Sequence, residues 1–308
     1  MEKLLVVGIE SVVGSNVALA LADRFEILGL YETDAVRFSG FETAHCDAED
    51  TDQLKSLARD FHPQWILHCG PLSASAWDLS TRRISAQGQA QPAKVLADLN
   101  DVIGSRLTVV TTDAVFAGPR MFHDEHAATT SATPAAAHAQ NLEGILQSTD
   151  ALVVRTHAYG FGPSDATRSF AAEVWDALTS QRAMELDGLR HATPILATDL
   201  APMLLRAYER RLQGLYHVPG AERTSPLRFA TELASVCGFA APKIRSADDS
   251  KPDTNEETSL ASRRARRALE MSMPMLHEGL VRFATQAEDG WRTRLAGGQV
   301  ERLCSAAA

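Results

Sequence analysis

Two glycines near the amino terminus have the spacing of a turn that binds phosphate groups. Gly8 and Gly14 stand six residues apart in "GIESVVGSN", at the end of the apolar run "KLLVVGI". Glycines in such a turn allow a tight bend, and they let backbone N–H groups approach a pyrophosphate at the start of the next helix. Ser11 lies between them, and a serine fits there without strain if its φ angle is negative.

A carboxylate follows at the distance that dinucleotide recognition requires. Glu32 ends the apolar run "FEILGLYE", 24 residues after Gly8. An acidic side chain at this place hydrogen-bonds the adenosine ribose 2′-hydroxyl and repels a 2′-phosphate, which favours NAD(H) over NADP(H). The alternative interpretation is a solvated charge at a strand end. Asp47, in "HCDAED", is placed to meet the adenine edge.

Alternating apolar runs and helical patterns must position these residues. Such a pattern indicates a parallel sheet covered on both faces, and right-handed crossovers make it a doubly wound α/β fold. We expect strands at 3–9, 25–32, 64–70, 106–116 (running into a loop) and 151–160, and a late strand at 214–220.

The pattern changes after Gly160, so we expect two domains. Residues 1–160 form a nucleotide-binding domain, and residues 161–308 form mainly a second domain, from which some chain returns to the sheet. The second half contains amphipathic helices at 168–181 and 225–239, the latter with Ser225 as its cap and Pro226 at its first position. The last helical stretch is broken around Pro274.

Composition narrows the range of functions. The formal net charge of −9 argues against nucleic acid or an anionic membrane as a partner. No apolar run approaches the length of a membrane span. Four scattered cysteines without a Cys-x-x-Cys spacing predict no metal site and a cytoplasmic protein. The densest basic cluster, Arg263, Arg264, Arg266 and Arg267, is interpreted as the exposed face of a helix.

Four stretches carry a resemblance to a known family. They are "TTDAVFAG" (111–118), "VVRTHAYG" (153–160), "ATPILATDLA" (192–201) and "GLYHVPGAERTSPLRFATELA" (214–234). Their order and spacing resemble the dTDP-4-dehydrorhamnose reductase branch of the extended short-chain dehydrogenases/reductases, from residue 1 to about residue 285. The resemblance implies a Rossmann-type NAD(P)-binding domain and a smaller C-terminal α/β domain that binds a nucleotide-linked sugar. It also implies hydride transfer to the C4 keto group of that sugar.

The same resemblance assigns roles to individual residues. Thr112 would hold and polarise the keto group, Asp113 and Phe116 would shape the following loop, and Glu125 matches the acidic segment of the family. The substrate side would be lined by Asp113, Phe116, Phe170, Trp175 and Thr193. The full set of expected cofactor contacts is Gly8, Ser11, Val13, Gly14, Glu32, Asp47, Ala48, Cys69, Gly70 and Thr111.

The catalytic pair of that family is missing. A Tyr donates the proton, and a Lys four residues later lowers the pKa of that Tyr. Counting from Pro134 puts His138 and Leu142 at these positions, and a shift by one residue puts Ala137 and Asn141 there. The only tyrosines are Tyr31, Tyr159, Tyr208 and Tyr216, and no lysine occurs between Lys94 and Lys243, so a Tyr-x-x-x-Lys pair exists nowhere in the chain.

Three hypotheses follow. The first is a protein that binds NAD(P) or a sugar nucleotide without the reductase activity, as a binding or regulatory partner. The second is an active oxidoreductase that uses His138 as proton donor with Thr112, because imidazole titrates near pH 6.5. The third is an interaction protein, or homodimer, whose cofactor cleft is vestigial. Ser11 in place of the family's glycine, Ala114 in place of its aromatic residue, and "HCGPLSASAWD" in place of its Asn-Ala-Ala loop also depart from the pattern.

Overall fold

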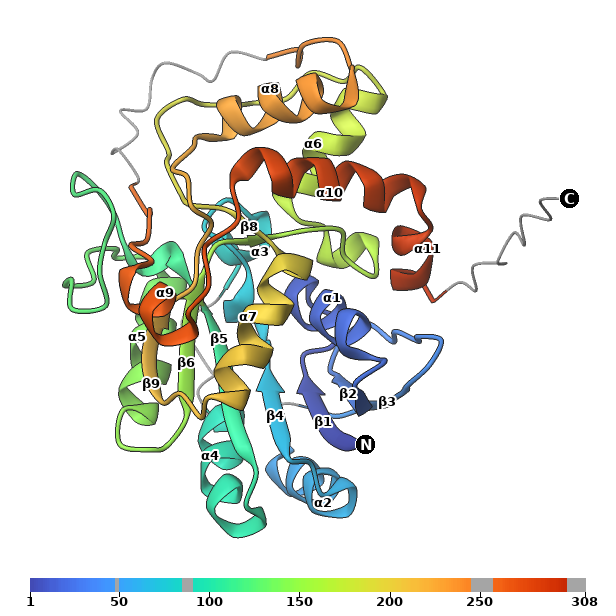
Figure 1. Cartoon of the computed structure of the whole chain (residues 1–308), viewed down its shortest axis with the longest axis vertical. Coiled ribbons are helices and arrows are strands. Elements are labelled where there is room, and N and C mark those ends of the chain that lie inside the picture. Colours follow the sequence, from blue (N-terminus) through green and yellow to red (C-terminus); the bar gives the residue numbers. More distant parts are fainter. Residues whose placement is uncertain (48–49, 85–90, 245–256, 298–308) are drawn as a thin grey trace, which may run out of the picture.

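A seven-stranded parallel sheet forms the centre of the computed structural model, which describes residues 1–47, 50–84, 91–244 and 257–297 (Figure 1). The strand order is β3-β2-β1-β4-β5-β6-β9, and every neighbouring pair is parallel. The strands are β1 (Glu2–Val7), β2 (Phe25–Tyr31), β3 (Glu42–His45), β4 (Trp65–His68), β5 (Arg106–Thr112), β6 (Leu152–Thr156) and β9 (Gly214–His217). The predicted doubly wound α/β fold is confirmed.

The order of the strands reverses between β1 and β4. The chain moves outward from β1 to β3 and then returns to the other side of β1 with β4. In such sheets, ligands bind outside the carboxyl ends of the strands at the reversal point. The fold therefore directs attention to the residues that follow β1, β2 and β4.

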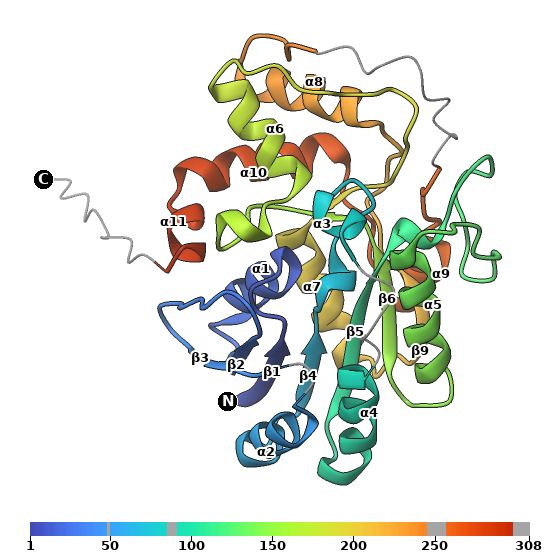
Figure 2. The same ribbon diagram turned by 180° about the vertical axis from the view of Figure 1, so that it is seen from behind.

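Side chains alternate between the two faces of the sheet and fill two separate cores. Along β1, Leu4 and Val6 belong to one core and Leu5 to the other, as the period of two in a strand requires. Helices cover both faces (Figures 1 and 2). One face carries α1 (Val12–Leu21) and α7 (Ala197–Glu209), and the other carries α2 (Thr51–Phe61), α4 (Gln91–Ile103) and α5 (Pro134–Leu146).

A helical layer lies beyond the carboxyl ends of the strands, at the top of Figure 1. In this layer α8 packs against both α6 and α10. Its elements are α6 (Phe170–Thr179), α8 (Pro226–Cys237), α10 (Leu276–Glu288) and α11 (Trp291–Leu295), and the pair β7 (Ala158–Tyr159) and β8 (Ile195–Leu196) leads into it. The second half also contributes β9 and α7 to the sheet and its cover. The division at residue 160 therefore remains a prediction about domains.

Local signals in the sequence account for several helix boundaries. The Ser225 hydroxyl accepts from the Arg228 amide at the start of α8, with Pro226 at the first position, as predicted. Pro274 lies between α9 (Arg263–Leu269) and α10, where the break was expected. The four arginines of α9 are exposed, which confirms their interpretation as a solvated helix face. In the described part of the chain, no helix has the length and apolar character to cross a membrane.

Candidate functional site

The turn between β1 and α1 has the geometry that its glycines predict. Gly8 has φ +80°, and a Cβ on it would come within 2.3 Å of the Cys69 carbonyl oxygen. A Cβ on Gly14 would come within 2.4 Å of the Gly8 carbonyl oxygen. Both positions therefore require glycine, the first for its backbone angle and both for close approach. The turn packs directly onto the end of β4 at the reversal point of the sheet.

Ser11 fits the turn as the cap of α1. Its φ is −71°, so the side chain causes no backbone strain. The Ser11 hydroxyl accepts from the Gly14 amide at 2.9 Å and donates to the Gly8 carbonyl at 2.8 Å. One of the four N–H groups that a helix start leaves without a partner is thus used internally. The amides of Val12 and Val13 lie in the first turn of α1, where the helix itself offers no acceptor.

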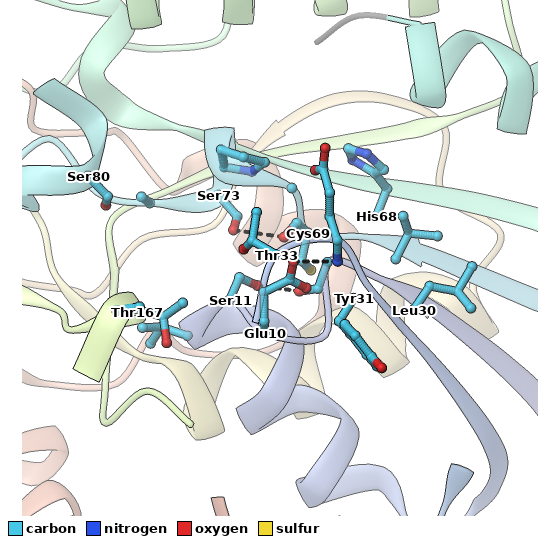
Figure 3. Close-up of a pocket in the computed structure, with 18 of the residues that line it drawn as sticks. Glu10, Ser11, Leu30, Tyr31, Thr33, His68, Cys69, Ser73, Ser80 and Thr167 are labelled. Atoms are coloured by element: carbon cyan, nitrogen blue, oxygen red, sulfur yellow. Dashed lines mark hydrogen bonds between the residues drawn. The ribbon is translucent and has the colours of Figure 1, made fainter. Parts of the chain in front are cut away.

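A cavity of about 330 Å³ opens at this turn (Figure 3). Its wall combines the glycine turn, the ends of β2 and β4, the segment 70–80 and the segment 166–169. Figure 3 shows Ser11, Tyr31 and Cys69 around the same space, although they come from three different elements. The cavity occupies the position at which an α/β sheet of this strand order takes its ligand.

Two side chains at the end of β4, His68 and Cys69, line the cavity and are buried. Burial lowers the pKa of His68 to about 4, and within the described residues its Nδ1 has no hydrogen-bond partner. Burial likewise raises the pKa of the Cys69 thiol, which is fully buried. Both side chains are therefore neutral at pH 7, and the charged groups of the cavity come from other elements.

The structure places half of the expected cofactor contacts on the cavity wall. Gly8, Ser11, Glu32, Cys69 and Gly70 line it. Val13, Gly14 and Thr111 are buried behind the wall, and Asp47 is exposed outside it. Ala48 lies outside the described residues.

The end of β5, where the resemblance places the reacting groups, is closed. Thr112 and Asp113 are completely buried. The Thr112 hydroxyl accepts from the Ala114 amide as the cap of a 3-10 turn (Asp113–Val115). Asp113 accepts from the Ala76 amide at 2.9 Å and from the Thr258 hydroxyl. The polar atoms that the family would turn toward a substrate are therefore engaged within the protein.

The segment that follows β4 covers this region. Its 3-10 turn, Pro71–Ser73, contacts both β5 and α5. Trp77 lies edge-on to the ring of Phe170, with ring centroids 5.2 Å apart. Asp78 accepts from the Phe170 amide at 2.7 Å, and its pKa is raised because the carboxyl is buried. The segment 71–78 thus joins the sheet to the helical layer.

Helix α5 carries the positions at which the family has its catalytic Tyr and Lys, and none of these positions lines the cavity. His138 is half-buried, and its Nδ1 is buried without a partner among the described residues. Leu142 is buried in the core that also contains Leu72 of the covering segment. Ala137 and Asn141 are exposed. No hydrogen bond joins His138 to Thr112 within the described structure, so the two candidate catalytic residues do not form a hydrogen-bonded pair.

The residues expected on the substrate side are core residues here. Phe116 stacks on His123, with ring centroids 4.1 Å apart. Phe170 and Trp175 are both less than a tenth exposed and pack among aromatic rings. The Thr193 hydroxyl accepts from the Leu260 amide at 3.1 Å. None of them lies on the wall of the cavity.

Sequence reasoning did not single out Glu10, His68 or the segment 166–169 on the cavity wall. For Glu10 a signal was available, since an acidic residue stands inside the glycine turn itself. For the segment 166–169 no local signal existed, because it reaches the turn through the packing of the helical layer.

Together, the glycine turn, the reversed strand order and the cavity between them define a protein with a Rossmann-type fold. A family model described as the RmlD substrate binding domain matches residues 1–289, and the chain belongs to this family. Among curated proteins, no relative matches the chain.

Solved structures share the fold over nearly the whole chain. A hypothetical dTDP-4-dehydrorhamnose reductase from Sulfolobus tokodaii is 20% identical with a TM-score of 0.73, covering 89% of this chain and 97% of that one. The Bacillus anthracis dTDP-4-dehydrorhamnose reductase in complex with NADP is 18% identical with a TM-score of 0.72. The match covers 94% of this chain and 100% of that one. The UDP-glucose 4-epimerase of Thermotoga maritima, with UDP-glucose, is 14% identical with a TM-score of 0.78. The match covers 94% of this chain and 99% of that one.

Proposed function

We propose that this protein binds an adenine dinucleotide of the NAD(P) type in the cavity and lacks the keto-reductase activity of its family. The observation that carries the proposal is the separation of two regions. The glycine turn and the ends of β2 and β4 line an accessible cavity, whereas Thr112 and Asp113 at the end of β5 are completely buried. Binding residues are thus accessible and the expected reacting residues are not.

Glu32 supports a preference for NAD(H). It lies on the cavity wall at the end of β2, where an acidic side chain accepts from a ribose hydroxyl and repels a 2′-phosphate. The amide of Val12, a residue that lines the cavity at the start of α1, would hold the pyrophosphate. A bound dinucleotide would supply a hydride acceptor or donor. The chain's own contribution here is binding and orientation of the adenosine half.

The absent dyad supports the loss of reductase activity. Leu142 is a buried core residue at the position of the lysine, so α5 offers His138 no cation from that position. A function as a binding or regulatory partner, alone or as a homodimer, is consistent with a retained fold and cavity. We place this protein in the cytoplasm, because the three cysteines in the described structure are all free thiols.

A nucleotide-linked sugar is the second ligand that we propose. The Thermotoga maritima neighbour contains UDP-glucose, and the family is described as a substrate binding domain. The resemblance places the sugar beside Phe170, so a sugar ligand there would have to displace Trp77 from its contact with that ring. Binding of the dinucleotide needs no such displacement.

Calorimetric titration of the full-length protein with NAD⁺ and NADP⁺ tests the proposal. We expect one site per chain with tighter binding of NAD⁺. Absence of heat with both compounds, together with an unchanged melting temperature, would favour the vestigial cleft. The alternative of a His138-dependent reductase has one observation in its favour, the unpartnered Nδ1 of that ring among the described residues. It requires that His138→Ala abolishes an existing turnover.

A further inference from the structure

Glu10 is a second carboxylate at the end of β2, and it comes from the glycine turn. Its Oε1 accepts from the Glu32 amide at 2.9 Å, which ties the turn to the strand end (Figure 3). Glu10 and Glu32 both line the cavity. The place at which the adenosine ribose is expected is therefore approached by acidic side chains from two different elements.

The other oxygen of Glu10 is not satisfied within the protein. Oε2 is buried, and none of the described residues donates a hydrogen bond to it. A buried carboxylate oxygen without a donor is costly, and a hydroxyl or N–H group of a ligand would relieve that cost. Glu10 itself is only partly buried and reaches the cavity wall, so a rotation of its carboxylate would bring Oε2 to a donor of a ligand in the cavity.

The charged groups that act on Cys46, at this end of the cavity, are acidic. The pKa of the Cys46 thiol is raised to about 11, first by burial and then by Asp50, Asp47 and Glu32. The thiol is therefore neutral at pH 7. The cationic side chain on the wall, Arg168, belongs to the segment 166–169 and is paired with Asp176. The end of β2 thus favours a donor such as a ribose diol and opposes a phosphate.

We propose that Glu10 is a specificity-determining residue that accepts from the ribose diol and excludes a 2′-phosphate independently of Glu32. This inference rests on the proposed function, since it assigns the recognition of the dinucleotide in the same cavity. It differs from the expectation for the family, in which the acidic residue at the end of β2 alone makes this distinction. Here removal of Glu32 alone leaves a carboxylate in place.

The test is a calorimetric comparison of NAD⁺ and NADP⁺ on full-length wild type, Glu10→Gln, Glu32→Gln and the double variant. The amide side chain of the Glu10→Gln variant still accepts from the Glu32 amide, but it has an NH₂ group in place of the second oxygen. We expect Glu32→Gln to retain a preference for NAD⁺ of about tenfold, and the double variant to lose it. Glu10→Gln alone should weaken NAD⁺ binding about tenfold. Glu26→Gln, at the opposite end of β2 and paired with Lys3, is the matched control and should change neither affinity.

The outcomes separate this inference from the proposed function. If the wild type binds neither dinucleotide, the proposed function is wrong and the inference is wrong with it. If the wild type prefers NAD⁺ and Glu32→Gln alone binds both equally, the proposed function stands and the role of Glu10 is refuted. If the Glu10 variants do not fold, a second measurement tests the inference with Glu10 intact.

This measurement compares the affinities of ADP and 2′-deoxy-ADP for the Glu32→Gln variant. We expect ADP to bind more tightly, and equal affinities would refute the inference.

Discussion

His157 Nδ1 lies 2.7 Å from Asp113 Oδ2, and neither side chain is more than 1% exposed. A carboxylate only accepts hydrogen bonds, so Nδ1 carries the proton of this ring. The other Asp113 oxygen accepts from the Ala76 amide, in the segment that follows β4. Asp113 therefore joins β5, the chain after β6 and the covering segment, at the place where the resemblance predicts substrate contacts.

Replacing Asp113 by Ala should lower the free energy of unfolding by about 3 kcal/mol, because it leaves several buried donors without an acceptor. Urea denaturation followed by circular dichroism measures this change. Asp52→Asn is the control, since Asp52 is an exposed residue of α2 whose ion pair with Lys55 is worth less than about 1 kcal/mol. Equal stability of Asp113→Ala and wild type would show that Asp113 has no such structural role.

Restoring the family's pair in the sequence should not restore its chemistry. In the double variant His138→Tyr/Leu142→Lys, the new lysine enters a closed apolar core, and Thr112 remains buried. We expect no oxidation of NADH with a 4-keto sugar nucleotide. We also expect a loss of about 3 kcal/mol of stability from the buried charge. Asn141→Lys, one position earlier on the exposed face, should change stability by less than about 0.5 kcal/mol. A turnover on the order of 1 s⁻¹ by the double variant would contradict the closed site.

Ser11 should behave as a helix cap. Ser11→Ala removes the acceptor of the Gly14 amide and should cost about 1 kcal/mol, whereas Ser11→Gly should cost only a few tenths of that. Thermal or urea unfolding of the two variants beside wild type measures the difference. A Ser11→Gly variant markedly more stable than wild type would mean that the serine strains the turn, against its φ of −71°.

Acid should destabilise the fold through His68. Its pKa is lowered from 6.5 to about 4 by burial, so between these values the unfolded chain binds a proton that the folded chain does not. Stability is fully present above pH 6.5 and falls as the pH decreases toward 4. The loss from this group reaches about 3 kcal/mol at pH 4, at 1.4 kcal/mol per pKa unit. Urea midpoints at pH 7, 5.5 and 4.5 should decrease less steeply for His68→Asn than for wild type. Parallel pH profiles would refute this role of His68.

Local patterns were sufficient to predict the sheet and several helix starts. The apolar runs at 3–9, 25–32 and 151–160 coincide closely with β1, β2 and β6, because a strand buried on both faces is largely apolar. Asp50 caps α2 by accepting from the Gln53 amide, three residues further along the chain. These features depend on neighbours within a few residues, and the sequence displays them directly.

The burial of Thr112 and Asp113 at the end of β5 depends on contacts between residues that are far apart in the sequence. The bond from the Ala76 amide to Asp113 spans 37 positions, and the bond from Thr258 to Asp113 spans 145. No pattern in the sequence indicates that residues 71–78 fill the region beside β5. The absence of a Tyr-x-x-x-Lys pair was evident from residue types alone, but the burial of Thr112 was not.

Fluorescence of NADH in one titration tests the central claim most directly. NADH is held at fixed concentration while full-length protein is added, and a 4-keto sugar nucleotide is then added to the saturated complex. We predict a saturable change in fluorescence on binding and a constant signal after the sugar nucleotide. A signal that never changes with protein would contradict the proposed binding. A decay on the order of 1 s⁻¹ after the second addition would contradict the proposed loss of reductase activity.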